Sequence, residues 1–107
     1  MPREALQTLT EPMYYVLLSL TRPLCGIEIM DCVKGLSHGR LTIGPGTLYT
    51  MLKKFEDNGI ITPADPAASG KRKNYVITQR GLEFLKQEYA RLKRQAEDGW
   101  EIMEGII

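Results

Sequence analysis

The sequence predicts a mainly α-helical fold that contains one small β-hairpin and ends in a long helix. Three observations lead to this prediction. Apolar residues recur at spacings of three and four in several separate segments, as they do on the buried face of a helix. Two short β-prone segments flank a stretch rich in Pro, Ala, Ser and Gly. Helical spacing then resumes and continues to the end of the chain. We therefore divide the 107 residues into a domain over 10–77 and a C-terminal helix over 78–107.

Composition and charge distribution narrow the classes of partner. Charged residues at 25% and hydrophobic residues at 43% are ordinary for a globular protein. The net charge is only +1, but residues 40–80 contain seven basic and three acidic residues, a local charge of +4. Residues 81–107 contain four basic and six acidic residues, a local charge of −2. A basic middle in a near-neutral chain fits a localised anion-binding surface.

Apolar runs and cysteines indicate the compartment. No apolar run approaches the roughly 18 residues of a membrane span, and no signal-peptide pattern opens the chain. Cys25 and Cys32 lie seven residues apart on one predicted helix, about 10 Å along its axis, which is too far for a disulfide. They share an apolar stripe with Ile29 and Leu36, so we expect core thiols in a reducing cytoplasm. His38 is the single histidine, and we expect neither a metal site nor a cofactor.

The first two predicted helices have clear boundaries. Thr10 and Pro12 mark the start of a helix that ends before residues 22–23. Its apolar stripe consists of Met13, Val16, Leu17 and Leu20. A second helix over about 26–37 carries Cys25, Ile29, Cys32, Val33 and Leu36 on one side. After it we expect the turn of a helix–turn–helix, enlarged by a short strand over 41–43. His38 in this turn fits a surface residue, with a phosphate contact as the alternative.

The third predicted helix runs over 45–57 and has two chemically different faces. Pro45 suits a first helical position, and Gly59 suits a helix end. One face is apolar and consists of Leu48, Met51, Leu52 and Phe55. The opposite face carries Thr47, Thr50, Lys53, Lys54 and Asp57, with Tyr49 at its border. A face of hydroxyls and lysines on a helix of this size can enter a DNA major groove, and a merely solvated face is the alternative.

The segment after this helix reads as a basic hairpin. Residues 60–62 and 71–77 are β-prone and flank the tip over 63–70. The return strand is expected to begin with three cations, Lys71, Arg72 and Lys73. A basic hairpin directly after a candidate recognition helix predicts a winged helix–turn–helix. A solubilising basic loop on an edge strand is the alternative.

The last helix, over about 78–107, is capped by Thr78 and is too long for this domain to bury. Its apolar positions form a heptad-like seam of Leu82, Leu85, Tyr89, Leu92, Ala96, Trp100 and Met103. We expect this seam to form a homodimer, with packing onto its own domain as the alternative.

These motifs together resemble the PadR family of bacterial transcriptional regulators, in the compact subfamily with a single C-terminal helix. The resemblance rests on the Gly-Thr-Leu-Tyr helix start at 46–49, the Gly-Lys-Arg-Lys-Asn-Tyr wing at 70–75, and Thr78 with Gly81. It implies a dimeric winged-helix repressor whose C-terminal helix packs on the partner subunit. It also implies that Thr47, Tyr49 and Lys53 contact DNA from the recognition helix, and that 71–73 lie along the wing.

Our functional hypothesis from the sequence is a regulator that binds double-stranded DNA. Lys54 and the three wing cations would contact phosphates, Thr47 and Tyr49 would fix the register, and Thr50 and Lys53 would reach base edges. Some relatives bind aromatic ligands between subunits, so Tyr14, Tyr15, Tyr89 and Trp100 are candidate residues for a small aromatic effector. Filling of the dimer core is the alternative role for these aromatic residues.

Other functional classes fit the sequence less well. No nucleophile–base arrangement, phosphate-binding loop or metal spacing supports an enzyme. The main alternative is a winged-helix module that contacts an acidic protein instead of DNA. A winged-helix sensor of metals or oxidants fits poorly, because both cysteines are expected on a core stripe.

Overall fold

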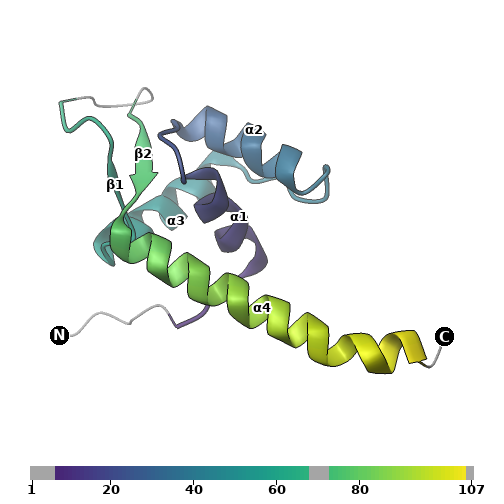
Figure 1. The fold of residues 1–107 in the computed structure, drawn as a ribbon. Helices are drawn as coiled ribbons and strands as arrows, with labels where there is room; N and C mark the ends of the chain where they lie inside the picture. Colours follow the sequence, from purple (N-terminus) through teal and green to yellow (C-terminus); the bar gives the residue numbers. More distant parts are fainter. Residues whose placement is uncertain (1–6, 68–72, 106–107) are drawn as a thin grey trace.

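The computed structural model describes residues 7–67 and 73–105. Within these ranges the chain forms α1 (Glu11–Ser19), α2 (Gly26–Leu36), α3 (Pro45–Asp57), β1 (Ile61–Pro63), β2 (Tyr75–Ile77) and α4 (Gln79–Gly105). The first three helices pack together beside the two-stranded hairpin, and α4 runs under this domain and extends well past it (Figure 1). The mainly helical fold with one small hairpin and a long final helix is therefore confirmed.

The domain has one apolar core, formed by the predicted stripes of α1 and α3 together with part of α2. Its largest fully enclosed side chains are Phe55, Leu17, Leu20, Ile29, Leu48, Leu52, Ile61, Val16 and Val33. Removing side chains of this size from water stabilises the fold by roughly 1.5–3 kcal/mol each. The rotation of α1, α2 and α3 about their axes is fixed by this burial.

Both ends of the recognition helix and the start of α1 follow the predicted signals. The Thr10 hydroxyl accepts a hydrogen bond from the Met13 N–H at 3.4 Å, and Pro45 is the first residue of α3. After α3, Gly59 adopts a positive φ of 72°, and the Ile60 N–H donates to the Phe55 carbonyl at 2.9 Å. A left-handed residue at this point lets the chain turn sharply toward β1.

The predicted stripe of α2 is wrong at both ends. Cys25 precedes the helix as its N-cap and is half-buried, Cys32 is half-buried, and Leu36 is 44% exposed. The residues that face the core are Gly26, Ile29, Val33 and Ser37, so the buried face is rotated relative to the prediction. Two close contacts explain the rotation. The Tyr49 ring covers Gly26, and the Ser37 hydroxyl is needed inside to accept from the Leu41 N–H at 3.0 Å.

The short strand predicted over 41–43 is also wrong, because these residues form irregular structure. The free edge of β2 is already taken by Leu24, which exchanges both backbone hydrogen bonds with Tyr75 at 2.9 and 3.0 Å. The Leu41 N–H is instead bound to the Ser37 hydroxyl. Without a partner strand, a three-residue β-prone segment gains no ladder hydrogen bonds.

The hairpin consists of two three-residue strands. β1 and β2 are antiparallel and pair Ile61 with Ile77, Thr62 with Val76, and Pro63 with Tyr75. The return strand starts at Tyr75, later than the basic run with which we expected it to begin. The Ile77 N–H donates to the Leu20 carbonyl at 2.8 Å, which fastens the hairpin to the end of α1.

The start of α4 is anchored at three points. The Thr78 hydroxyl accepts from the Gly81 N–H at 3.0 Å and so caps the helix, as predicted. Leu85 is buried in the core, and the buried carboxylate of Glu88 accepts from the Leu9 N–H at 2.6 Å. Arg91 donates two hydrogen bonds to this carboxylate, at 3.0 and 3.2 Å. These bonds and the one from the Leu9 N–H lower the pKa of Glu88, although burial alone would raise it.

Candidate nucleic-acid interface

The outer face of α3 is set by what the helix buries. Leu48, Leu52 and Phe55 are almost fully enclosed, so the residues between them must point outward. All five residues that we predicted on this helix are exposed: Thr47, Tyr49, Thr50, Lys53 and Lys54. The predicted hydroxyls and ammonium groups are thus exposed on α3, which packs against β1 of the hairpin.

The polar groups on this face are not equivalent. The Lys53 ammonium lies 3.5 Å from the Asp57 carboxylate one turn later, whereas none of the ion pairs among the described residues involves Lys54. The Thr50 hydroxyl donates to the Gly46 carbonyl at 3.0 Å, so its oxygen is left to act as an acceptor. Lys54 is therefore the cation of α3 that is available without breaking an ion pair.

Tyr49 connects the recognition helix to α2. Its side chain is 41% exposed, and its hydroxyl lies so close to Gly26 that a Cβ there would be 2.5 Å from the oxygen. Gly26 is the first residue of α2, so the phenol lies at the N-terminal end of that helix. The sequence offered one signal for this contact, a glycine at the start of a helix, which we did not connect with Tyr49.

Two cations of the basic segment over 40–80 also have roles in the fold. Arg40, part of the basic middle segment, donates to Glu11 at 2.9 Å and to the Tyr15 hydroxyl at 3.0 Å. The pKa of Arg40 is raised, mainly by its hydrogen bond to the Glu11 carboxylate and also by Tyr15. At the base of the wing, the Lys73 ammonium lies 5.3 Å from the centre of the Tyr75 ring. Lys71 and Arg72 lie outside the described residues.

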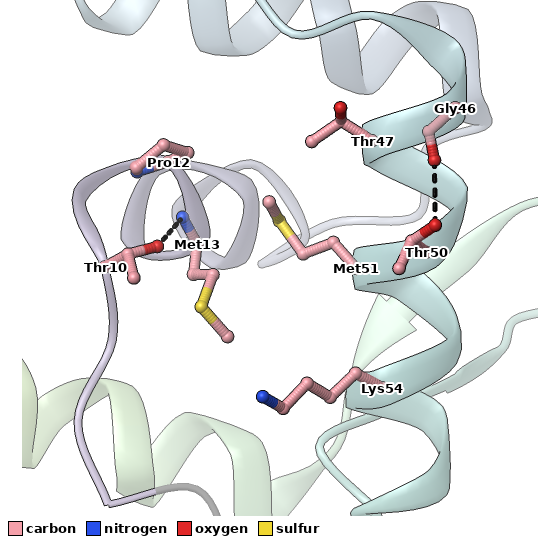
Figure 2. Close-up of a pocket in the computed structure, with 8 residues that line it drawn as sticks. All are labelled: Thr10, Pro12, Met13, Gly46, Thr47, Thr50, Met51 and Lys54. Atoms are coloured by element: carbon pink, nitrogen blue, oxygen red, sulfur yellow. Dashed lines mark hydrogen bonds between the residues drawn. The ribbon is translucent and has the colours of Figure 1, made fainter.

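A pocket of about 700 Å³ flanks α3 on the side that faces α1. It is lined by the N-cap Thr10 and by Pro12 and Met13 of α1, and from α3 by Gly46, Thr47, Thr50, Met51 and Lys54. Figure 2 shows the side chains of Met13, Met51 and Lys54 reaching from the two helices into the space between them. We did not predict this pocket, because α1 and α3 are far apart in the sequence and only the packed fold brings them together.

Comparisons with known proteins identify the family. Residues 16–87 match the family described as "Transcriptional regulator PadR-like family". The chain belongs to the PadR family. It is a member of a family of DNA-binding transcriptional regulators, which are not enzymes. No curated protein matches the chain.

Solved structures of other PadR-family regulators share this fold. A PadR-family regulator from Eggerthella lenta is 26% identical, with a TM-score of 0.67 over 86% of this chain and 80% of that one. A PadR-family regulator from Clostridium difficile is also 26% identical, with a TM-score of 0.57 over 80% of this chain and 95% of that one. A PadR-like regulator from Bacillus cereus, at 20% identity, has a TM-score of 0.66 over 86% and 89% of the two chains.

The residues that we predicted for a dimer seam from their heptad-like spacing are mostly exposed in the single chain. Leu85 is buried in the core of the domain, and Leu82 is half-buried. The exposed members of the seam are Tyr89, Leu92, Ala96, Trp100 and Met103. The neighbouring Ile102, which we did not place on the seam, is 65% exposed.

The four residues predicted for an aromatic effector do not form one cluster within this PadR-family chain. The rings of Tyr14 and Tyr15 are in edge-on contact, with their centres 5.9 Å apart. The pKa of Tyr14 is raised, mainly by burial and secondly by the neighbouring Tyr89. The Tyr15 hydroxyl accepts a hydrogen bond from the Arg40 guanidinium. Trp100 follows Tyr89 by eleven residues on a continuous helix, about 16 Å along the axis. Trp100 therefore lies well away from Tyr89 within the single chain.

Two further features bear on the predicted partners. No helix among the described residues is long and apolar enough to cross a membrane. The same part of the chain contains no group of three or more His, Cys, Asp or Glu residues that could hold a metal ion.

Proposed function

We propose that this PadR-family chain acts in the cytoplasm as a homodimeric repressor that binds duplex DNA through α3 and the wing. The observation that carries the proposal is the orientation of α3. Three buried apolar side chains turn a face of hydroxyls and ammonium groups outward, beside a hairpin whose sequence continues the positive charge. A dimer that covers its operator would exclude other proteins from that stretch of DNA, which is why we propose repression.

The side chains on this face suggest separate roles. Lys54, together with Lys71, Arg72 and Lys73 of the wing, would neutralise phosphates and make affinity fall with salt. Tyr49 and Thr47 would fix the register on the backbone. Lys53 and Thr50 would reach base edges. Because the Thr50 hydroxyl already donates to Gly46, it would accept from an amino group, as adenine and cytosine offer in the major groove.

The aromatic residues near α4 support an inter-subunit effector site as the regulatory part of this proposal. Tyr14 lies near Tyr89, and Trp100 is 63% exposed on the far half of α4. In a dimer, the partner's α4 would bring an indole to the tyrosines and offer flat surfaces for an aromatic ligand. Trp100 fluorescence would report such a ligand, and no response to a panel of aromatic acids and cations would leave these residues as dimer core.

The test of DNA binding is an anisotropy titration against the labelled duplex upstream of the chain's own gene, beside a scrambled duplex, at several salt concentrations. We expect tighter binding to the upstream duplex and a steep salt dependence. The double variant Lys71→Ala, Arg72→Ala should weaken binding and reduce the slope of log K against log salt by about 0.9 for each phosphate that the variant no longer neutralises. The matched control is Lys86→Ala, Arg94→Ala, which removes the same charge from exposed positions of α4.

Two outcomes would contradict the proposal. Equal effects of the two double variants would show that net charge and not the wing determines affinity. Absence of binding to either duplex at low salt would favour the alternative function, a winged-helix module that contacts an acidic protein.

A further inference from the structure

The fold buries one charged side chain among the described residues, Glu88, which is 4% exposed. Its carboxylate lies where the segment before α1 meets α4. The Leu9 N–H donates to one carboxylate oxygen at 2.6 Å, and Arg91 donates to both oxygens, at 3.0 and 3.2 Å. Leu9, Glu88 and Arg91 therefore form one closed group of hydrogen bonds between the two segments, which we call the Glu88 latch.

The Glu88 latch provides a directional contact that apolar packing does not provide. Leu85, three residues earlier in α4, is buried in the core and would stay covered if the helix slid or rotated slightly. Hydrogen bonds to a carboxylate instead require donor and acceptor at a set distance and angle. Burial of a charge costs free energy, and a well-packed apolar side chain would often stabilise the fold at least as well. The latch is therefore better suited to fixing a position than to adding stability.

The position of the latch gives it control over the direction of α4. The helix is attached to the domain at its start, where Thr78 caps it and Gly81 lies against the Ile60 carbonyl. Glu88 follows Gly81 by about 10 Å along the axis, and no described residue beyond the latch is buried. Glu101 lies about 30 Å from Gly81, so a shift of about 1 Å at Glu88 becomes about 3 Å at Glu101 if the helix pivots at its start.

We propose that Glu88 is a positioning residue for DNA binding, because its latch fixes the angle between α4 and the DNA-binding domain. In the proposed homodimer, this angle in each subunit sets the distance between the two recognition helices. That distance determines which spacing of half-sites the dimer can bind. The latch itself lies within one chain, and only its consequence for DNA rests on the proposed function.

The test is a distance between two spin labels on the full chain, measured by pulsed electron paramagnetic resonance. Glu56→Cys and Glu101→Cys place the labels at exposed positions of α3 and α4. The native thiols are first removed by Cys25→Ser and Cys32→Ala. Labelled chains are mixed with an excess of unlabelled chain, so that the distance within one chain is measured.

We expect one narrow distance in the labelled parent. Glu88→Gln should shift or broaden it by about 3 Å for each 1 Å of movement at the latch. Arg91→Gln should change it less, because the Leu9 N–H still binds the carboxylate. The matched control is Val33→Ala, which removes buried methyl groups from α2 and weakens the core without touching the latch. It should leave the distance unchanged.

Two results would overturn the proposal. An unchanged distance in Glu88→Gln would mean that apolar packing alone holds the angle of α4. An equal change in Val33→Ala would mean that the angle follows stability and not the latch. Circular dichroism shows whether each variant is folded, and Arg91→Gln decides by the same criterion if Glu88→Gln is not.

A second arm tests the consequence for DNA. Anisotropy titrations compare the upstream duplex with two versions that have one base pair inserted or removed between the half-sites. Wild type and Val33→Ala should prefer the native spacing, and Glu88→Gln should lose part of this preference. A preference that persists while the label distance changes would disprove control of the spacing. Absence of DNA binding by wild type would contradict the proposed function, and the label distances would then decide on the latch alone.

Discussion

Gly81 lies in the first turn of α4, where the helix passes directly over the chain that leads into the wing. A Cβ at this position would overlap the Ile60 carbonyl oxygen and would lie 2.8 Å from Cγ1 of Ile77. The Ile60 carbonyl also accepts the Thr78 N–H at 2.9 Å, so it cannot move away without loss of the helix start. The close packing of α4 on the hairpin therefore depends on the missing side chain.

Gly81→Ala should destabilise the fold by about 1–3 kcal/mol, because the added methyl group meets backbone that is already hydrogen-bonded. Gly99→Ala is the matched control. Gly99 lies in the same helix with no atom within 4 Å of an added Cβ, so alanine should stabilise the helix by up to about 1 kcal/mol. Urea denaturation at one protein concentration measures both changes. A neutral Gly81→Ala variant would show that α4 is held less tightly than the structure indicates.

Glu88 is the buried acid that joins the segment before α1 to α4. Its pKa is lowered in the folded state by the Arg91 hydrogen bonds and the Leu9 N–H. The charged carboxylate therefore stabilises the fold above the unfolded-state pKa of about 4.3, and this contribution is lost as the pH falls through the lower folded-state pKa.

Glu88→Gln should lose about 1–2 kcal/mol of stability near neutral pH, since a hydrogen-bonded charged group is replaced by a neutral one. The difference from wild type should shrink when the pH is taken below about 4. Thermal denaturation of both proteins across this pH range measures the difference in stability. The control is Glu83→Gln, which changes an exposed residue of the same helix. A difference that stays constant with pH would mean that the Glu88 charge is not what stabilises this contact.

Among the elements, α3 could be predicted almost completely from the sequence. Its proline start, its glycine end and the spacing of Leu48, Leu52 and Phe55 are all local signals, and local signals determine which face of an amphipathic helix is buried. Once the buried face of α3 is known, the residues on its exposed face can be predicted as well. The pairing of Lys53 with Asp57 is also local, since the two are four residues apart.

The features that escaped prediction depend on contacts between distant segments. The orientation of α2 depends on Tyr49 above Gly26 and on the buried hydroxyl of Ser37. The expected strand over 41–43 is absent because Leu24 occupies the edge of β2. The pocket between α1 and α3 likewise exists only after the helices pack. No periodicity within one segment encodes such contacts.

The ion pair on α3 leads to a prediction for the recognition helix. Asp57 places a negative charge on the proposed DNA-facing surface and holds Lys53. Asp57→Asn should tighten binding to DNA about fivefold, the equivalent of ~1 kcal/mol for one repulsive charge near the surface, and should steepen the salt dependence. Stability should hardly change, because an exposed pair of this spacing contributes only about 0.3–0.5 kcal/mol.

The control for this prediction is Asp98→Asn, which changes the net charge equally on the exposed far half of α4. Anisotropy titrations of both variants against the same duplex give the comparison. Equal affinity of the two variants would mean that the outer face of α3 does not meet DNA.

For the whole molecule, the dominant feature is the length of α4 relative to the domain. The chain measures 55 Å along its longest axis and 22 Å along its shortest, and Figure 1 shows the last turns of α4 extending away from the other elements. Along this half, Leu92 is 39% exposed, Met103 is 55% exposed and Trp100 is 63% exposed. Apolar side chains that recur on one face of an unpartnered helix favour a second copy of the same helix as the partner.

Leu92→Glu should disrupt this proposed homodimer. In a twofold arrangement the substitution places two carboxylates in one apolar seam, so the dissociation constant of the dimer should rise at least about 100-fold. Gln87→Glu is the matched control, since it adds the same charge five residues earlier on the opposite side of the helix, where the side chain is exposed. Sedimentation velocity at micromolar concentration should show wild type and Gln87→Glu as dimers and Leu92→Glu as a monomer. DNA affinity should fall in parallel, because a single subunit reads only one half-site. A wild-type monomer, or a Leu92→Glu dimer as stable as the control, would exclude this seam as the dimer interface.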